Sequence, residues 1–205
     1  MTNEKHAVNR EQQRHQQRQQ KIKQKVDEKI AKAQDERGLV IVITGNGKGK
    51  STSGFGTVAR ATGHGLNAAV VQFIKGNWEC GEANLLKQHG VEFCVMATGF
   101  TWETQNKAAD IAAAQITWAD ATRLLADPDI DMVLLDELTY MISYHYLDLD
   151  DVINAINNRP HHQHVIITGR SCHRRLIEMA DTVSEVQEIK HAFHSGVKAQ
   201  KGLDW

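Results

Sequence analysis

The residue types best suited to chemistry stand in one short segment, which runs from an apolar stretch into a glycine-rich turn. Residues 41–52 read Ile-Val-Ile-Thr-Gly-Asn-Gly-Lys-Gly-Lys-Ser-Thr. Because glycine has no Cβ, successive backbone N–H groups of such a turn can surround an anion. A helix that begins near Lys50 adds the positive end of its dipole, and the lysine supplies a full charge. The pattern is typical of a loop that binds the phosphates of a nucleotide.

The predicted phosphate-binding loop comprises Gly45, Asn46, Gly47, Lys48, Gly49, Lys50, Ser51 and Thr52. The Ser51 hydroxyl suits a magnesium ion bound to the same phosphates. Thr44 stands where the usual pattern has its first glycine, so we expect the loop to hold phosphates in a pose of its own. The alternative is an ordinary glycine-rich turn, which the joint occurrence of strand, spacing and Gly-Lys-Ser disfavours.

Two acidic residues follow a second apolar stretch. Residues 131–137 read Asp-Met-Val-Leu-Leu-Asp-Glu, which predicts a buried strand that ends in Asp136 and Glu137. In proteins with a phosphate-binding loop, an acid at this place holds magnesium. Consecutive side chains of an extended segment point in opposite directions, so the two residues should differ in role. Glu137 is the candidate metal ligand together with Ser51, and Asp136 is the alternative.

Further loops carry residues that could shape a binding surface. Residues 97–104 read Ala-Thr-Gly-Phe-Thr-Trp-Glu-Thr and place Phe100 and Trp102 two positions apart in a polar stretch. Core packing is the usual fate of large aromatic residues, but in a polar loop beside a ligand they can form its binding surface. Lys75 and Arg170, at predicted strand ends, are further candidates.

Alternating strand-like and helix-like segments must position these loops. Strands are predicted at 39–44, 68–74, 91–96, 132–135, 165–168 and 182–189, and helices at 51–62, 107–126, 150–157 and 174–180. Such alternation predicts an α/β fold with a mostly parallel sheet flanked by helices, in the RecA-like arrangement of P-loop proteins. Ligands of such sheets bind beyond the carboxyl ends of the strands. Thr44, Lys75, Ala97, Asp136 and Gly169 should then converge at one rim.

The first 37 residues differ from the rest in charge. They contain ten Lys or Arg against six Asp or Glu, a net charge of +4, whereas the remainder has fourteen against nineteen, a net charge of −5. Residues 1–20 have almost nothing to bury, which predicts disorder or order that depends on a ligand. A helix should follow, with an apolar stripe of Ile22, Val26, Ile30 and Ala33 and with Gly38 as its stop. We therefore divide the chain into a basic leader with an N-terminal helical extension (1–38) and a catalytic domain (39–205).

Composition bounds the class and the location. At 205 residues and 41% hydrophobic, the chain can build one α/β domain with an appendage. No apolar run approaches the ~20 residues of a bilayer span, and no signal core is seen, so we expect a cytoplasmic protein without membrane contact. The three cysteines, Cys80, Cys94 and Cys172, are typical of reduced thiols. A solvated helix explains the basic leader better than a nucleic-acid site, and no nucleic-acid partner is expected.

Several segments, taken together and in order, strongly resemble one family. Besides the loop that begins at Thr44, they are Val71-Gln-Phe-Ile-Lys-Gly, Met96-Ala-Thr-Gly-Phe-Thr-Trp-Glu-Thr, Leu135-Asp-Glu-Leu-Thr-Tyr and Ile167-Thr-Gly-Arg. From about Gln17 to the C-terminus, including the closing Gly196-Val-Lys-Ala-Gln, the chain resembles the P-loop type of the ATP:corrinoid adenosyltransferases. Ser51 stands where threonine is frequent in that family and keeps the hydroxyl. The extreme N-terminus is not covered.

The resemblance implies a reaction and its partners. Cobalt of a corrinoid, reduced to Co(I), attacks C5′ of ATP, a Co–C bond forms and tripolyphosphate leaves. The substrates would be ATP and cobinamide or cob(II)alamin, the latter reduced to cob(I)alamin, with Mg²⁺ as cofactor and Mn²⁺ as its alternative. A reduced flavoprotein would donate electrons, and the enzyme would be a homodimer. It would serve adenosylcobalamin biosynthesis and corrinoid salvage, within porphyrin biosynthesis.

The same resemblance implies roles for individual residues. Residues 45–51 would wrap the triphosphate, with ATP turned around relative to most P-loop enzymes, and Lys50 and Glu137 would be catalytic. Ser51 with Glu137 would hold magnesium. Phe100 and Trp102, with Met96 as a further candidate, would lie under the corrin and displace its lower ligand, which eases reduction of Co(II).

Two other functions remain open from the residues alone. A small P-loop kinase would use the same loop, but an arginine-rich lid is not evident, although Arg170, Arg174 and Arg175 form a candidate cluster. A nucleotide-dependent switch protein would need loops that sense the γ-phosphate, and no such pair is recognisable. The reaction products distinguish the three: tripolyphosphate, ADP with a phosphorylated acceptor, or slowly released phosphate.

Overall fold

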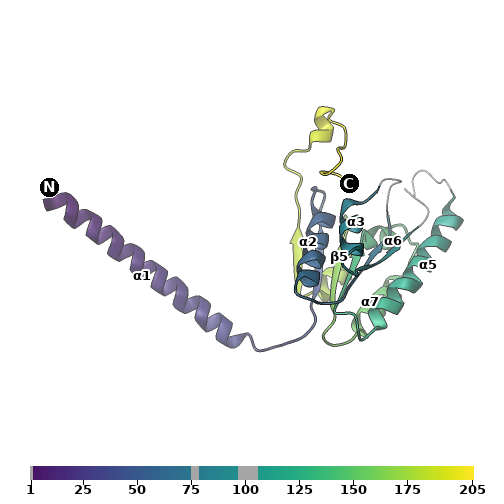
Figure 1. The fold of residues 1–205 in the computed structure, drawn as a ribbon, viewed down its shortest axis with the longest axis horizontal. Coiled ribbons are helices and arrows are strands. Elements are labelled where there is room, and N and C mark those ends of the chain that lie inside the picture. Colours follow the sequence, from purple (N-terminus) through teal and green to yellow (C-terminus); the bar gives the residue numbers. More distant parts are fainter. Residues whose placement is uncertain (1, 75–78, 97–105) are drawn as a thin grey trace. The chain divides into compact units, whose positions relative to one another are not determined.

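The computed structural model of the chain describes residues 2–74, 79–96 and 106–205 (Figure 1). It divides into two compact units, Met1–Glu36 and Arg37–Trp205, which are described separately. Four residues predicted at the rim, Lys75, Ala97, Phe100 and Trp102, lie outside the described residues. Within the described ranges, no helix combines the length and the apolar character that crossing a bilayer requires.

The first unit is one long helix, α1, which spans Thr2–Lys32. Its sequence is rich in Gln, Lys, Arg and Glu, which are good helix formers, and the Gln24 amide donates to Glu28 at 3.1 Å one turn later. The helix includes residues 2–20, for which the sequence predicts disorder or order that depends on a ligand, and it ends at Lys32, short of Gly38. Whether this order depends on a ligand stays a prediction.

The second unit is built on a six-stranded parallel sheet, with strand order β3-β2-β4-β5-β1-β6. Its strands are β1 (Val40–Thr44), β2 (Ala68–Gln72), β3 (Glu92–Val95), β4 (Met132–Asp136), β5 (His164–Thr168) and β6 (Thr182–Glu185). The predicted parallel α/β fold is confirmed. Since β5 lies between β1 and β4, its carboxyl end separates the glycine-rich loop from the two acids.

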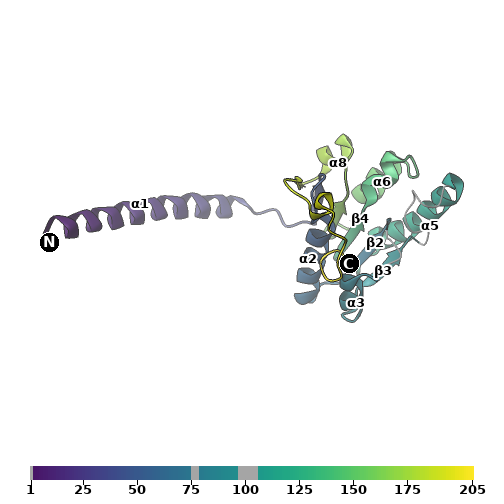
Figure 2. The ribbon, with the colours of Figure 1, turned by 90° about the horizontal axis from the view of Figure 1, so that it is seen from above.

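Helices cover both faces of the sheet (Figure 2). They are α2 (Lys50–Gly63), α3 (Gly81–Lys87), α5 (Lys107–Ala126), α6 (Leu138–Ser143), α7 (Leu149–Asn157) and α8 (Arg174–Met179), with a 3₁₀ turn, η1, at Ala192–Ser195. Sequence analysis did not predict α3, α6 or η1, because each is too short to display a helical apolar period.

Alternating side chains of the strands pack into two separate hydrophobic cores, one on each face of the sheet. Val133 and Leu135 of β4 pack with residues of α5, α6, α7 and α8, whereas Leu134 packs with Phe55 and Val58 of α2. Successive side chains of a strand point to opposite faces, so a sheet covered on both sides reads as a continuous apolar run. With both faces buried, the carboxyl ends of the strands remain for a ligand.

Two boundaries differ from the sequence prediction for packing reasons. Gly38 does not stop a helix; its N–H donates to the His161 carbonyl at 2.7 Å, and a Cβ there would lie 2.0 Å from the Gln163 carbonyl oxygen. The last strand, predicted to reach residue 189, ends at Glu185. Its continuation instead packs against the glycine-rich loop.

Candidate active site

The glycine-rich loop joins β1 to α2, as predicted. Gly45 and Gly49 have φ angles of 101° and 116°, a region that favours glycine. Lys50 is the first residue of α2 and is only 6% exposed. Its Nζ donates to the Gly47 carbonyl at 2.8 Å, so the loop folds around the lysine. Burial lowers the pKa of Lys50, and the charge of Glu137 opposes that shift.

Asp136 is fixed by hydrogen bonds from its surroundings. It ends β4, is 3% exposed, and accepts from the Thr168 hydroxyl at 2.7 Å and from the Gln72 amide at 3.3 Å. Burial raises the pKa of Asp136, while hydrogen bonds from Thr168, Ser51 and Gln72 lower it. Asp136 thus ties β2, β4 and β5 to the first turn of α2.

Glu137, by contrast, keeps a buried oxygen unpaired. It has a left-handed φ of 59°, and its N–H donates to the Thr168 hydroxyl at 3.0 Å. Its Oε2 is buried and has no hydrogen-bond partner. Burial, with the charge of Asp136, raises the pKa of Glu137 to about 7, against the opposing charges of Lys50 and Arg170. The neighbouring acids therefore occupy different environments.

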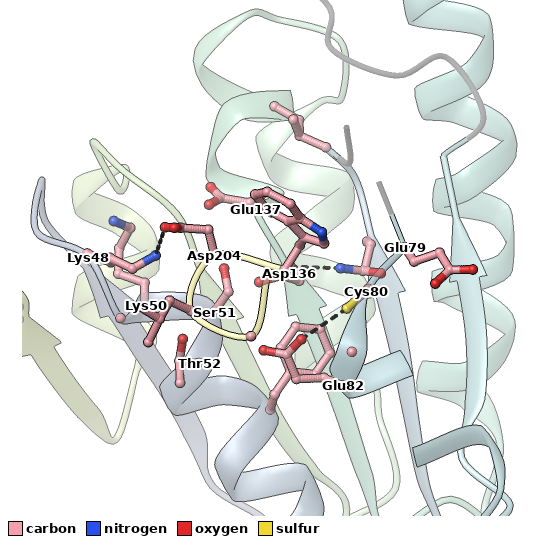
Figure 3. A pocket seen from close by; sticks show the side chains of 18 of the residues that line it. Lys48, Lys50, Ser51, Thr52, Glu79, Cys80, Glu82, Asp136, Glu137 and Asp204 are labelled. Atoms are coloured by element: carbon pink, nitrogen blue, oxygen red, sulfur yellow. Dashed lines mark hydrogen bonds and ion pairs between the residues drawn. The ribbon is translucent and has the colours of Figure 1, made fainter. Parts of the chain in front are cut away.

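A cavity of about 620 Å³ opens in front of these residues (Figure 3). One wall is polar and contains Lys48, Gly49, Lys50, Ser51 and Thr52, with Asp136 and Glu137 beside them. Gly45, Asn46 and Gly47 are part of the loop but not of the lining. The apolar side chains of the lining are Phe55, Ile74, Leu85, Leu203 and Trp205. The cavity is therefore lined by both charged and apolar side chains.

Residues from the far end of the chain complete the cavity. Gly202–Trp205 line it, and the carboxylate of Asp204 lies 2.5 Å from Lys48 Nζ (Figure 3). The chain just after β6 also packs on the loop, since the Gly47 N–H donates to the Val186 carbonyl at 2.7 Å. Added Cβ atoms at Gly45 and Gly47 would lie 2.4 Å from the Val186 oxygen and 2.6 Å from the Gln187 oxygen. These two glycines are required by packing within the protein.

Two further predicted residues, Arg170 and Met96, are not part of the cavity lining. Arg170 is exposed and acts on Lys50 and Glu137 through its charge, and its carbonyl accepts from the Thr139 hydroxyl at 2.7 Å. Met96, predicted as a corrinoid contact, is 2% exposed and packs in the core, because its backbone N–H continues the pairing with Gln72. Lys75, Phe100 and Trp102 are not among the described residues.

Two polar residues that hold the acids in place were not predicted from the sequence. Gln72 and Thr168 each end an apolar strand, and both are buried. A lone polar residue at the carboxyl end of a strand was the available signal, since buried polar groups are nearly always hydrogen-bonded. The turn at 202–205 gave no such signal.

The oxygen donors of the site fit a hard cation that arrives with a nucleotide. No group of three or more His, Cys, Asp and Glu able to hold a metal occurs in the described part of the chain. The unpaired Glu137 Oε2, the Ser51 hydroxyl and Asp136 are oxygen ligands, which Mg²⁺ prefers. Mg²⁺ is usually held by one or two carboxylates together with substrate phosphates, which is the set available here.

A parallel sheet, a glycine-rich loop between β1 and α2, and acids at the end of β4 define a P-loop nucleotide-binding protein. Residues 36–205 match the family described as ATP:corrinoid adenosyltransferase BtuR/CobO/CobP, and residues 1–30 match the cob(I)alamin adenosyltransferase N-terminal family. The chain belongs to the ATP:corrinoid adenosyltransferase family, which confirms the resemblance seen in the sequence.

Similar proteins carry the same description. Over 176 residues, the chain is 65% identical to corrinoid adenosyltransferase CobA of Salmonella typhimurium and 64% identical to the corrinoid adenosyltransferase of Escherichia coli. Both alignments cover 86% of this chain and 90% of the relative. The corrinoid adenosyltransferase of Pseudomonas aeruginosa is 52% identical over 178 residues, with 86% and 88% covered.

Proposed function

We propose that this protein transfers the 5′-deoxyadenosyl group of ATP to the Co(I) centre of a corrinoid and releases tripolyphosphate. The carrying observation is a cavity lined by both the P-loop and apolar side chains, in a chain of the corrinoid adenosyltransferase family. A triphosphate suits the wall formed by Lys48–Thr52, and a nucleoside or the edge of a corrin suits the apolar side.

The charge of the cavity supports a requirement for a divalent cation. Among the described residues that line it are five acids (Glu79, Glu82, Asp136, Glu137 and Asp204) and two lysines (Lys48 and Lys50). A triphosphate would meet net repulsion there unless a cation entered with it. We propose Mg²⁺, with Mn²⁺ as a substitute, held by Ser51 and Glu137, with Asp136 as the alternative ligand. Bound there, it would neutralise charge on the leaving phosphates.

The protein residues have little covalent work in this reaction. Co(I) is itself a nucleophile, so no proton has to be removed from it. Lys50 stabilises the negative charge that develops on tripolyphosphate. The two walls hold cobalt, C5′ and the leaving oxygen in line, which removes much of the entropic barrier. Catalysis by Lys50 and Glu137 is therefore electrostatic.

The corrinoid side of the site is proposed from sequence. Phe100 and Trp102 would form a platform under the corrin and displace its lower ligand, so that Co(II) is reduced more easily. The corrinoid would be cobalamin or cobinamide, and a reduced flavoprotein would supply the electron. A homodimeric, cytoplasmic enzyme completes the proposal.

Product analysis tests the reaction directly. Purified protein is mixed anaerobically with chemically reduced cob(I)alamin, ATP and Mg²⁺, and both products are quantified. The proposal predicts adenosylcobalamin and tripolyphosphate in equal amounts. ADP with a phosphorylated acceptor would indicate a kinase, and slow phosphate release without a cobalt product would indicate a switch protein.

A tryptophan comparison tests the platform. Trp102→Ala should impair adenosylation severely from cob(II)alamin but much less from chemically generated cob(I)alamin, which has already lost its lower ligand. Trp118→Phe is the control, because Trp118 packs against Phe73 with ring centroids 6.4 Å apart and should affect both substrates equally. Equal losses for Trp102→Ala with both substrates would contradict the platform.

A further inference from the structure

The residues at 200–205 form a compact turn that presents one carboxylate to the phosphate-binding loop. The Gln200 N–H donates to Asp204 Oδ2 at 2.7 Å, and the Asp204 N–H donates to the Gln200 carbonyl at 2.8 Å. These bonds hold the Asp204 side chain in place. Its other oxygen, Oδ1, lies 2.5 Å from Lys48 Nζ (Figure 3). We call residues 200–205 the C-terminal turn.

Lys48 belongs to the wall that a polyphosphate would use, so Asp204 stands where a ligand phosphate would bind. Both side chains are partly exposed, Lys48 at 49% and Asp204 at 26%. Ion pairs in such surroundings are weak and exchange readily. A phosphate oxygen makes the same charge-assisted hydrogen bond with lysine and carries further charge for the rest of the loop.

Residues 186–205 contact the glycine-rich loop at both of their ends, but through different kinds of bond. The start is held by backbone hydrogen bonds, from Val186 N–H to the Thr44 carbonyl at 2.8 Å and from Gly47 N–H to the Val186 carbonyl. The contact of Asp204 with Lys48 is an ion pair between side chains. An anion can replace the second kind of contact without breaking the first.

We infer that Asp204 is a specificity-determining residue of the nucleotide site, because it competes with ligand phosphates for Lys48. This inference rests on the proposed function in one respect, that a polyphosphate occupies the loop. Ligands whose phosphates reach Lys48 must displace Asp204, whereas ligands without phosphates gain nothing from that exchange. Return of Asp204 to Lys48 then favours departure of tripolyphosphate after transfer.

The competing explanation is that the ion pair only fastens the chain end to the fold. The two explanations predict opposite effects of removing the carboxylate. A fastening role predicts a lower melting temperature and weaker or unchanged binding of anions for Asp204→Asn. Competition predicts tighter binding of anions, and only where Lys48 is present.

The test measures binding of inorganic tripolyphosphate by calorimetry at low and high salt. Asp204→Asn should bind about two- to five-fold more tightly at low salt, the range expected for loss of a partly exposed ion pair. The gain should shrink at high salt because screening weakens the pair. Product inhibition of adenosylation by tripolyphosphate should become stronger by a similar factor, and adenosine binding should not change.

Three further variants make the test decisive. Lys48→Met should weaken tripolyphosphate binding, and adding Asp204→Asn to it should give no gain. Glu188→Gln is the matched control, because it removes a carboxylate of residues 186–205 whose partner is His194, at 2.8 Å.

Unchanged or weaker binding by Asp204→Asn, or an equal gain in the Lys48→Met background, would overturn the inference. Failure of the proposed function would appear separately, as absence of adenosylcobalamin in the wild-type reaction. A wild-type enzyme that forms this product, and whose tripolyphosphate affinity is the same in Asp204→Asn, would refute the role of Asp204 alone.

Discussion

The two segments that line the cavity, the phosphate wall and the C-terminal turn, are built in different ways. The phosphate wall, Lys48–Thr52, follows directly from β1 and opens α2, so strand, loop and helix all lie within residues 40–63. The C-terminal turn comes from about 150 residues further along and reaches the same cavity through an ion pair. A local motif therefore reveals one wall of a site, while the other is created by packing over long sequence distances.

The glycines of the loop also differ in whether their role comes from the local motif or from distant contacts. In the sequence, Gly45, Gly47 and Gly49 look alike. In the structure, the first two are pressed against Val186 and Gln187, whereas a Cβ at Gly49 would have nothing within 4 Å. Glycine is required at 45 and 47 by the fold, and open space at 49 is left for a ligand.

The largest expected effect separates these glycines. Gly45→Ala combines a left-handed φ with a backbone oxygen 2.4 Å from the new Cβ, and should lower the free energy of unfolding by about 3 kcal/mol or more. Gly49→Ala carries only the backbone strain, about 1–2 kcal/mol, and should chiefly impair tripolyphosphate binding. Urea unfolding of both variants measures the difference. Equal destabilisation would mean that packing against Val186 is not the reason why glycine is required at position 45.

Lys50→Ala should act on the ligand and spare the fold. Loss of its charge-assisted contact should cost about 2 kcal/mol or more of nucleotide binding, at least ~30-fold in affinity. Since Lys50 is buried at a cost to its charged form, the melting temperature should change little. Calorimetry with ATP and Mg²⁺, with Lys48→Met alongside, ranks the two lysines. Wild-type affinity in Lys50→Ala would refute the assignment of this wall.

Glu137→Gln should trade function for stability. The folded pKa of about 7 exceeds the ordinary 4.5, so the ligand-free wild type holds this proton more tightly when folded. The stability that this proton contributes is therefore lost as pH rises from about 4.5 to about 7. A glutamine at this position does not titrate, so the variant does not undergo that loss. The variant should be up to about 3 kcal/mol more stable at pH 8 and equal to wild type near pH 4. Magnesium-dependent turnover should fall sharply.

A different result would assign the metal to Asp136 instead of Glu137. If Glu137→Gln keeps its turnover across a magnesium titration and only loses stability, then Glu137 is structural and Asp136 becomes the metal ligand. Denaturation at several pH values and the titration together decide between the two acids.

Thr168→Val should give the smallest effect. The hydroxyl donates to Asp136 and accepts from the Glu137 N–H, so its loss should cost about 1 kcal/mol of stability and raise the magnesium concentration needed for activity. Thr168→Ser keeps the hydroxyl and should restore the magnesium dependence. A serine variant as impaired as the valine variant would show that the methyl packing, and not the hydrogen bonds, is what matters.

Local patterns predicted most of the fold. Apolar runs on β1, β4 and β5 are continuous because both faces are covered, and the glycine-rich loop identified the phosphate wall. The acids after β4 were predicted as well, but their division of roles depends on Thr168, Gln72 and burial, which a sequence does not display.

The parts that escaped prediction depend on distant contacts. Gly38 was interpreted as a helix stop. In the structure, glycine is required at this position because a Cβ would collide with the Gln163 carbonyl, which belongs to a distant part of the sequence. The C-terminal turn offers no periodicity and no motif of its own. Its contact with Lys48 arises only once β6 has carried the chain past the loop.

Hydrogen exchange with and without inorganic tripolyphosphate tests most directly whether the two walls share one ligand. The account predicts changes of opposite sign: amides of residues 45–52 become more protected as they surround the anion, and amides of residues 200–205 become less protected as Asp204 leaves Lys48. In Asp204→Asn the second change should vanish while the first persists. Increased protection in both segments, or no change at 200–205, would contradict competition between the C-terminal turn and the phosphates.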